Sequence, residues 1–208
     1  MPNVKYFTIW LALIMIAVFV LQSIFPAFES ALILDKSAVW HLEVWRFVSA
    51  IFLHGSLIHL LSNLFALLLF GIILEKFIGS NKFLLVFFVS GILANVVAWS
   101  FYPLSLGASG AIMGIIGTLA IVRPMMTVWA FGVIMPMALA AVVWVFVDAI
   151  GIFIPDNTGH IAHLSGIFFG VLFGLIFWAN REQRKKRHSI EIPEHLLRKW
   201  ETLYMGVD

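Results

Sequence analysis

Long apolar runs separated by short polar turns dominate this sequence and decide what it can fold into. A helix needs about 20 consecutive apolar residues to cross the hydrocarbon core of a bilayer. The chain is 62% hydrophobic and only 12% charged, which leaves too little polar surface to cover a water-soluble globule. We therefore expect an all-α, polytopic membrane protein, a bundle of six transmembrane helices. The six apolar stretches lie at about residues 6–28, 57–77, 83–102, 109–122, 127–147 and 160–178.

The fourth stretch, residues 109–122, is shorter than the others. At 1.5 Å per residue it reaches across only about two thirds of a bilayer. A helix that begins partway through the membrane must have its N-terminus buried in protein or lining a wet cavity, because lipid offers its free N–H groups no partner. We therefore expect Ser109 below the membrane surface, in water that the protein itself admits.

Lysine and arginine are divided unevenly between the two sides of the predicted bundle. With six spans, both termini share one side with the turns at 78–82 and 123–126, and only Lys36 and Arg46 lie on the other side. The positive-inside rule then predicts cytoplasmic termini, with the starts of the fourth and sixth spans opening to the outer side. The basic residues on the predicted cytoplasmic side are Lys5, Lys76, Lys82, Arg123, Arg181, Arg184, Lys185, Lys186, Arg187, Arg198 and Lys199.

Two further segments have the apolar spacing of amphipathic helices. The connection at 30–56 is long but not polar, and its apolar residues recur every three to four positions, which is typical of short helices in the membrane interface. Residues 181–208 form a basic tail, in which Pro193 is suited to the first turn of a helix. We expect a membrane domain over residues 1–180 and a cytoplasmic tail over 181–208 with a possible amphipathic helix.

Two glycine-rich motifs each begin with a residue suited to nucleophilic catalysis. Ser109 lies in GASGAIMGIIG and His163 in AHLSGIFFGVLFG. Glycine-lined faces let membrane helices approach closely, which would bring the hydroxyl and the imidazole within hydrogen-bond reach. Either motif alone favours simple helix packing; their coincidence at the outer end of two glycine stripes indicates a Ser–His pair. The stripes are Gly110, Gly114 and Gly117 after the serine and Gly166, Gly170 and Gly174 after the histidine.

Polar side chains also occur within the second stretch, in HGSLIHLLSNLFAL. His59 and Asn63 are four residues apart and therefore share one face of a helix. Polar groups inside a span are costly and usually face a functional cavity. Both side chains donate hydrogen bonds, which suits stabilisation of an oxyanion together with the backbone N–H of Ser109. The alternative is that Asn63 only bonds a neighbouring helix.

These motifs, in this order, resemble the rhomboid family of intramembrane serine proteases. The resemblance covers most of the chain, from about residue 44 to 174. It implies a six-span rhomboid-like catalytic domain within residues 1–180. Ser109 would be the nucleophile, His163 the general base and later the acid, and His59 and Asn63 the oxyanion donors. The other matching positions, with structural roles or places near the site, are Trp45, Arg46, His54, Glu75, Gly107, Gly110 and Gly166.

The same resemblance leaves particular positions open. His160 lies one turn before His163 and is an alternative base, although the register to the glycine stripe favours His163. Some family members stack an aromatic ring under the histidine, where this chain has Met113. The family uses a dyad without a carboxylate, so Asp148 and Asp156 are interpreted as loop residues.

The resemblance implies acyl transfer through an acyl-enzyme that water hydrolyses. The expected partners are a transmembrane segment of a substrate and the lipid bilayer, with no nucleic acid, cofactor or metal. A movable fifth span and the outer loops would admit the substrate from the side.

Other classes of protein stay open at this stage. One is a catalytically inactive relative that binds transmembrane segments, and another is a small transporter. A third is a membrane metal or haem protein, because imidazole is a common ligand; sparse carboxylates, the absence of an HExxH motif and the absence of cysteine count against it. The histidines clustered toward the outer side are His41, His54, His59, His160 and His163.

Overall fold

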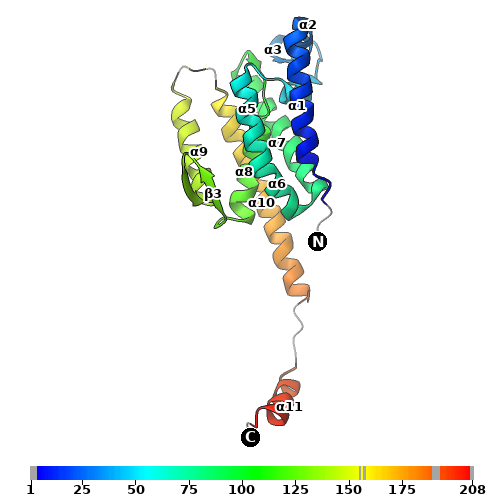
Figure 1. The fold of residues 1–208 in the computed structure, drawn as a ribbon, viewed down its shortest axis with the longest axis vertical. Coiled ribbons are helices and arrows are strands. Elements are labelled where there is room, and N and C mark those ends of the chain that lie inside the picture. The colour runs from blue at the N-terminus through cyan, green and yellow to red at the C-terminus, as the bar shows by residue number, and fades with distance from the viewer. Residues whose placement is uncertain (1–3, 155, 157, 189–192, 207–208) are drawn as a thin grey trace.

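A computed structural model describes residues 4–154, 156, 158–188 and 193–206, apart from the side chains of Pro26 and of residues 181–188. The protein is mostly helical, and its apolar helices lie side by side in a bundle (Figure 1). Within the described residues, four helices are long and apolar enough to cross a membrane, and two apolar helices are shorter. The four are α1 (Phe7–Ile24), the continuous run Leu57–Ile78, α7 (Ser80–Phe101) and His160–Asn180 of α10 (His160–His188); the shorter two are α8 (Ser109–Val122) and α9 (Met137–Gly151).

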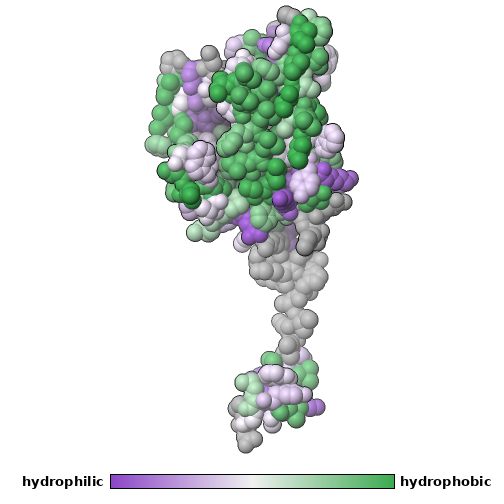
Figure 2. All heavy atoms as spheres, in the orientation of Figure 1, coloured by the Kyte–Doolittle hydropathy of each residue, from purple (hydrophilic) through white to green (hydrophobic). Residues whose placement is uncertain are grey.

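Helix α8 forms the centre of the bundle. It is apolar on every side, and all its residues from Gly110 to Ala120 are buried, as expected of a helix surrounded by protein. Helices α1 and α5 (Leu57–Ala66), by contrast, expose large apolar side chains outward, including Trp10 and Ile58. In the space-filling view the surface over α1 and α5 is largely hydrophobic (Figure 2). A surface of this kind is suited to contact with lipid.

The second predicted span is interrupted by a π-helical segment, η2 (Leu67–Gly71), between α5 and α6 (Ile72–Ile78). At the end of this span the buried carboxylate of Glu75 accepts hydrogen bonds from the backbone N–H groups of Phe7 at 2.8 Å and Thr8 at 2.9 Å. The hydroxyl of Ser80 donates to the same carboxylate. Glu75 therefore caps the first turn of α1, where the N–H groups have no partner within the helix.

Short elements make up the connection between α1 and α5, in agreement with the expected short helices. Strand β1 pairs with β2 antiparallel, Leu34 opposite Ser105, and so ties this connection to the segment before α8. The elements are α2 (Pro26–Leu32), β1 (Leu34–Asp35), α3 (Lys36–Trp40), α4 (Arg46–Ser49) and the 3₁₀ turn η1 (Ala50–Phe52), with β2 at Leu104–Ser105.

Arg46 holds this connection together from inside. Its guanidinium is buried and donates to the carbonyl oxygens of Ser30 at 2.8 Å and Ile33 at 2.6 Å, while it pairs with the carboxylate of Glu43. A buried arginine needs several acceptors, which these groups supply. The indole N–H of half-exposed Trp45 donates to the carbonyl of Ala31 at 3.4 Å. Both residues thus fix the first loop.

The prediction of one continuous fifth span is wrong. Its first half forms a β-hairpin of β3 (Thr127–Ala130) and β4 (Val133–Pro136), and α9 begins only at Met137. Phe131 and Gly132 both have positive φ, 53° and 79°, which is the backbone of a two-residue hairpin turn. Apolar periodicity does not separate this hairpin from a helix, because every side chain near it is apolar or small. The all-α expectation is therefore corrected by two short two-stranded sheets.

The C-terminal part is helical beyond the predicted domain boundary. Helix α10 continues past residue 180 to His188, and α11 spans Glu194–Tyr204 with Pro193 at its N-cap position. Apolar residues Leu196, Leu197 and Trp200 of α11 are exposed. The side chains of the basic cluster at 181–187 lie outside the described part of the chain. The division into a membrane domain and a cytoplasmic tail stays a prediction.

Candidate active site

A cavity of about 1220 Å³ opens among α5, α8, α9, the hairpin and the start of α10. In the space-filling view a hydrophilic recess lies between α9 and α5, near the upper end of the bundle (Figure 2). Apolar side chains such as Trp129 and Trp144 line this cavity. The residues of the sequence motifs line it as well: His59, Asn63, Gly107, Ser109 and His163. The structure therefore brings these predicted site residues around one space.

Ser109 is placed by a sharp turn before a helix. It is the first residue of α8, and the turn before it includes Gly107, whose φ of 121° is unfavourable for any residue with a side chain. The N–H of Gly107 donates to the carbonyl of Ala50 at 2.9 Å, which anchors the turn to the outer connection. The first N–H groups of a helix have no intrahelical partner, so this end of α8 offers donors for developing negative charge.

The two glycine stripes form a close seam between α8 and α10. A methyl group built on Gly166 would lie 2.1 Å from the carbonyl oxygen of Gly110, and one on Gly170 would lie 2.1 Å from that of Gly114. Only glycine permits such an approach of backbone to backbone. The Thr118 hydroxyl, 2.9 Å from the Gly170 carbonyl oxygen, adds a buried interhelical hydrogen bond. The seam fixes the serine and histidine helices relative to each other.

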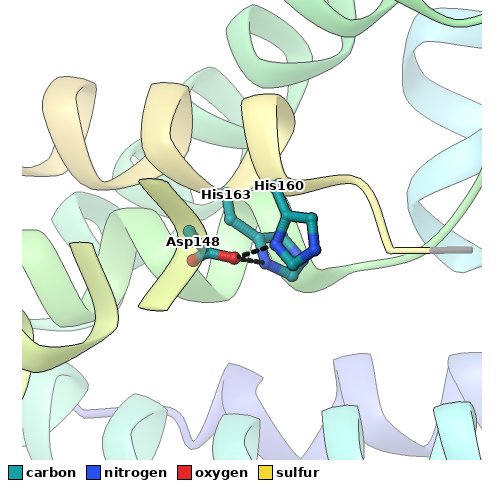
Figure 3. A group of neighbouring side chains, drawn as sticks. All are labelled: Asp148, His160 and His163. Carbon is teal, nitrogen blue, oxygen red and sulfur yellow. Dashed lines mark hydrogen bonds and ion pairs between the residues drawn. The ribbon is translucent and has the colours of Figure 1, made fainter. Parts of the chain in front are cut away.

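His163 lines the cavity and contacts a carboxylate that the sequence analysis set aside (Figure 3). Its Nδ1 lies 2.9 Å from Oδ1 of Asp148. Asp148 was interpreted as a loop residue, and this is wrong: it lies in the last turn of α9 and is only 3% exposed. Asp156, by contrast, is exposed and lies between α9 and α10, as expected.

His160, the alternative base, contacts α9 and the loop that follows it. Its Nδ1 lies 2.7 Å from the same Asp148 oxygen, and its Nε2 lies 3.3 Å from Oδ2 of Asp156. Its ring packs over Gly151, where an added methyl group would come within 2.2 Å of the imidazole. His160 is buried and is not among the residues that line the cavity. The geometry therefore favours His163 as the histidine that acts in the cavity.

Ser109 and His163 share the cavity without a direct bond. Among the described residues, no hydrogen bond joins the Ser109 hydroxyl to either histidine ring. Catalytic hydrogen bonds are often long before substrate binds and tighten in the reacting complex. The two residues therefore lie on facing helices of one seam and line the same cavity, without a hydrogen bond between them in this structure.

His59 and Asn63 lie across from the seam on α5. The His59 ring packs on Gly107, where an added methyl group would lie 2.8 Å from the ring carbon Cε1. The Asn63 amide donates one hydrogen to the His59 carbonyl at 2.9 Å. An amide nitrogen carries two hydrogens, so the second remains for a ligand. Asn63 thus bonds its own helix, and a bond to a neighbouring helix is not found among the described residues.

His54 supports His59 from the outer connection. The two rings pack edge to face with their centroids 5.1 Å apart. The backbone N–H of buried His54 donates to the Gln22 amide oxygen at 3.0 Å. Burial, with a smaller effect from neighbouring His59, lowers the pKa of His54 from 6.5 to about 4. The ring is therefore neutral at neutral pH, as suits a structural contact behind His59.

The cluster of Asp148, His160 and His163 bears on the metal hypothesis. The sequence analysis judged carboxylates sparse near the outer histidines, yet ligand-type atoms of these three residues lie within 4.8 Å of one another. The distances of 2.7 and 2.9 Å are those of hydrogen bonds. Hydrogen bonding alone therefore accounts for the arrangement.

The fold and the cavity define an integral membrane protein whose polar residues converge inside an apolar helix bundle. Residues 41–180 match the Rhomboid domain family. The chain therefore belongs to the rhomboid family, as the motifs predicted.

Several curated proteins are similar to this chain. The putative rhomboid protease YdcA of Bacillus subtilis is 31% identical over 158 residues, which cover 68% of this chain and 71% of that protein. The rhomboid protease GluP of the same organism is 32% identical over 136 residues, 65% of this chain and 27% of GluP. RHOMBOID-like protein 1 of Arabidopsis thaliana is 32% identical over 147 residues, 69% of this chain. The match spans only 37% of that last protein and 46% of RHOMBOID-like protein 6.

Proposed function

We propose that this protein is an intramembrane serine protease that hydrolyses peptide bonds in or near transmembrane segments, with Ser109 as nucleophile and His163 as general base. The convergence of Ser109, His163, His59 and Asn63 on one cavity inside an apolar bundle carries this proposal. Membership of the rhomboid family supports it, since named rhomboid proteases are among the similar proteins.

The proposed reaction is acyl transfer to serine. His163 takes the Ser109 proton as the hydroxyl attacks the scissile carbonyl, and then gives it to the leaving amine. Asn63, His59 and backbone N–H groups at the start of α8 stabilise the oxyanion, and Gly107 leaves room for the His59 ring. Water then hydrolyses the acyl-enzyme. The cavity admits that water while α8 and α10 keep lipid away.

The proposal includes six membrane-crossing segments, of which α8 and α9 are the two short ones. The termini are cytoplasmic and the cavity opens to the outer side, because the basic residues gather at the opposite ends of the helices. The tail after residue 180 is cytoplasmic, with α11 lying on the membrane by its exposed apolar side chains. The substrate segment enters beside α9 and the hairpin, whose Trp129 and Phe131 line the cavity.

The second candidate is a catalytically inactive relative that binds transmembrane segments, because the similar proteins include some named only rhomboid-like. The cavity with Ser109 and His163 on facing helices favours the protease. Binding of a transmembrane segment without its cleavage would favour the catalytically inactive relative. The metal-binding alternative predicts that a chelator abolishes activity.

The test uses the purified full chain in proteoliposomes with a model transmembrane substrate that contains small, helix-breaking residues. We expect cleavage by the wild type and by Ser165→Ala, a matched control whose hydroxyl bonds the Ile161 carbonyl at 2.7 Å. We expect none by Ser109→Ala. A fluorophosphonate should label the wild type and the control but not Ser109→Ala. Labelling or cleavage that survives in Ser109→Ala would refute the assignment.

Asn63 offers a second test of the same site. Loss of one oxyanion donor commonly slows catalysis by about 10²–10³-fold, so Asn63→Ala should slow cleavage by about that factor. Its folding should stay intact, because the amide bonds only its own helix among the described residues. An unchanged rate would remove Asn63 from the mechanism.

A further inference from the structure

Asp148 occupies a position that the proposed dyad does not explain. We infer that Asp148 is a positioning residue for His163: its carboxylate selects the imidazole tautomer that accepts the Ser109 proton and stabilises the imidazolium that follows. This inference rests on the proposed function and adds to it a third group, supplied by α9. The juxtaposition is drawn in Figure 3, where one oxygen of Asp148 faces both histidine rings.

The first step is the tautomer of His163. Its Nδ1 lies 2.9 Å from Oδ1 of Asp148, and a carboxylate only accepts hydrogen bonds. The proton of the neutral ring must therefore be on Nδ1, which leaves the lone pair on Nε2. Nε2 is then the ring atom that takes a proton from a nucleophile in the cavity. If Asp148 is removed, this contact no longer determines which ring nitrogen of His163 carries the proton.

The second step is the charge of Asp148. A carboxylate that is only 3% exposed is costly to bury unless it is paired. His160 supplies the pair: its two ring nitrogens each face a carboxylate, Asp148 at 2.7 Å and Asp156 at 3.3 Å. Both nitrogens must donate, so His160 carries the positive charge. The His160 imidazolium balances Asp148 and leaves His163 free to stay neutral at rest.

The third step follows the proton. When the Ser109 oxygen bonds to the carbonyl carbon, its proton moves to Nε2 of His163, and the carbonyl π electrons move onto the oxygen. The ring becomes an imidazolium whose Nδ1–H still donates to Asp148 Oδ1, now with charge assistance. The Nε2 proton then passes to the leaving amine as the C–N bond breaks. Asp148 stays ionised throughout.

A purely structural role for Asp148 leaves two features unexplained. A tie between α9 and α10 needs only the His160 contact, yet Oδ1 bonds both rings. Its other oxygen, Oδ2, is buried and has no hydrogen-bond partner among the described residues. A buried carboxylate with spare acceptor capacity next to a candidate base is typical of a group kept for its charge.

The direct test measures the tautomer. Protein with ¹⁵N-labelled histidine is studied by NMR in detergent micelles, and His163→Gln identifies the His163 signals. We expect an Nδ1–H, Nε2-lone-pair imidazole in the wild type and a mixture of tautomers in Asp148→Asn. An Nε2–H tautomer in the wild type would overturn the inference. The wild-type measurement needs no catalysis, so it decides the inference even if Asp148→Asn fails to fold. An inactive wild type would refute only the proposed function.

The kinetic test compares Asp148 with a side chain outside the cluster. Asp148→Asn should lower kcat at least tenfold with KM within about twofold; loss of a buried triad aspartate lowers kcat about 10⁴-fold in other serine proteases. The acid limb of its pH profile should move to lower pH, because the His163 imidazolium loses its carboxylate. Ser165→Ala on the same helix, whose hydroxyl bonds the Ile161 carbonyl at 2.7 Å, should stay within about twofold of the wild type.

The surroundings of His163 decide how the pH profile is read. The titratable groups around it are Asp148 of α9, His160 one turn earlier on α10 and His59 across the cavity on α5, and Asp156 and Tyr102 line the same cavity. The variant His160→Gln distinguishes the effect of Asp148 from that of His160, because it keeps the Asp148 carboxylate but removes the positive charge that balances it. A well-folded Asp148→Asn whose kcat and acid limb both match the wild type would overturn the inference.

Discussion

The two walls of the cavity are built in opposite ways. The seam between α8 and α10 brings two backbones together, so that an added methyl group would lie 2.1 Å from a carbonyl oxygen of the facing helix. On α9 most of the buried positions are small residues or Asp148, and contact with α10 includes the packing of His160 on Gly151. Its large side chains are mostly exposed: Leu139, Val142, Val145, Phe146, Val147 and Ile150.

The difference in packing between the α8–α10 seam (the tight wall) and α9 (the open wall) corresponds to two different roles. The tight wall carries Ser109 and His163, whose relative position the proposed proton transfer requires to be held closely. The open wall carries Asp148, whose contact with His163 requires the outer end of α9 to stay in place. A displacement of α9 by a substrate or by lipid would therefore take Asp148 away from His163 without moving Ser109.

The largest effect is expected where the seam is closest. Gly170→Ala places a methyl group 2.1 Å from the Gly114 carbonyl, so α8 and α10 must separate. Overpacking of a well-packed core costs typically about 1–3 kcal/mol, and a clash with backbone should reach or exceed the top of that range. Thermal unfolding in detergent measures the loss, and fluorophosphonate labelling should fall with it.

Gly159→Ala is the matched control for that variant. Among the described residues, a methyl group there meets Ala162 Cβ alone, at 3.7 Å, an ordinary contact, so stability should change by less than about 0.5 kcal/mol. Equal losses of stability in Gly170→Ala and Gly159→Ala would show that α8 and α10 are packed less closely than the structure describes.

The outer connection, which lies outside both walls, contains a buried ionisable group, His54, which makes stability depend on pH. Its pKa is about 4 in the folded protein and 6.5 in the unfolded chain. Between these values the unfolded state binds a proton that the folded state does not, so stability should fall as pH drops from 6.5 to 4. The full difference is roughly 3 kcal/mol.

Chemical denaturation at several pH values measures this loss. His54→Gln should reduce it, whereas His41→Gln should not, because His41 is exposed in the outer connection. A wild type with the same stability at pH 7 and pH 4 would contradict the prediction.

A smaller effect is expected from the hydrogen bond across the seam. Thr118→Val keeps the shape of the side chain but removes the hydroxyl that lies 2.9 Å from the Gly170 carbonyl oxygen. Interhelical hydrogen bonds in membranes contribute about 0.6 kcal/mol on average. We expect a loss near that value by thermal unfolding, and none in Thr127→Val at the exposed start of the hairpin.

The smallest effect is expected on the open wall. Phe146 is 65% exposed on α9, so Phe146→Ala should change stability by less than about 0.5 kcal/mol. The comparison is made by unfolding in the same detergent. A loss above about 1 kcal/mol would mean that α9 is packed as firmly as the seam, and the contrast between the walls would fail.

The sequence predicted the tight wall better than the open one. Glycine spacing is a local signal, so the facing stripes of α8 and α10 were visible before any coordinates, and so was the start of α8 at Ser109. The hairpin at 127–136 was missed because hydropathy measures only how apolar a segment is. The Phe131–Gly132 pair was the available signal, since Gly at the second position of a two-residue turn favours a hairpin.

Asp148 was missed for a different reason. It is 12 and 15 residues from the two histidines that it bonds, and no local periodicity links positions that meet only through helix packing. The predicted fifth span ended at residue 147, immediately before Asp148, whereas α9 continues to Gly151. Had Asp148 been counted inside the span, the cost of a carboxylate within an apolar helix would have marked it as a functional residue.

The π-helical turn Leu67–Gly71 has a consequence for how this chain can vary in length. An α-helix rotates by about 100° per residue. The π-helical turn contains one residue more than an α-helical turn would at the same place. On the N-terminal side of this turn, His59 and Asn63 line the cavity. On its C-terminal side, Glu75 accepts a hydrogen bond from the first residue of α1. Deleting a single residue from this turn would rotate one end of the span against the other, so the number of residues in the turn should not be free to change.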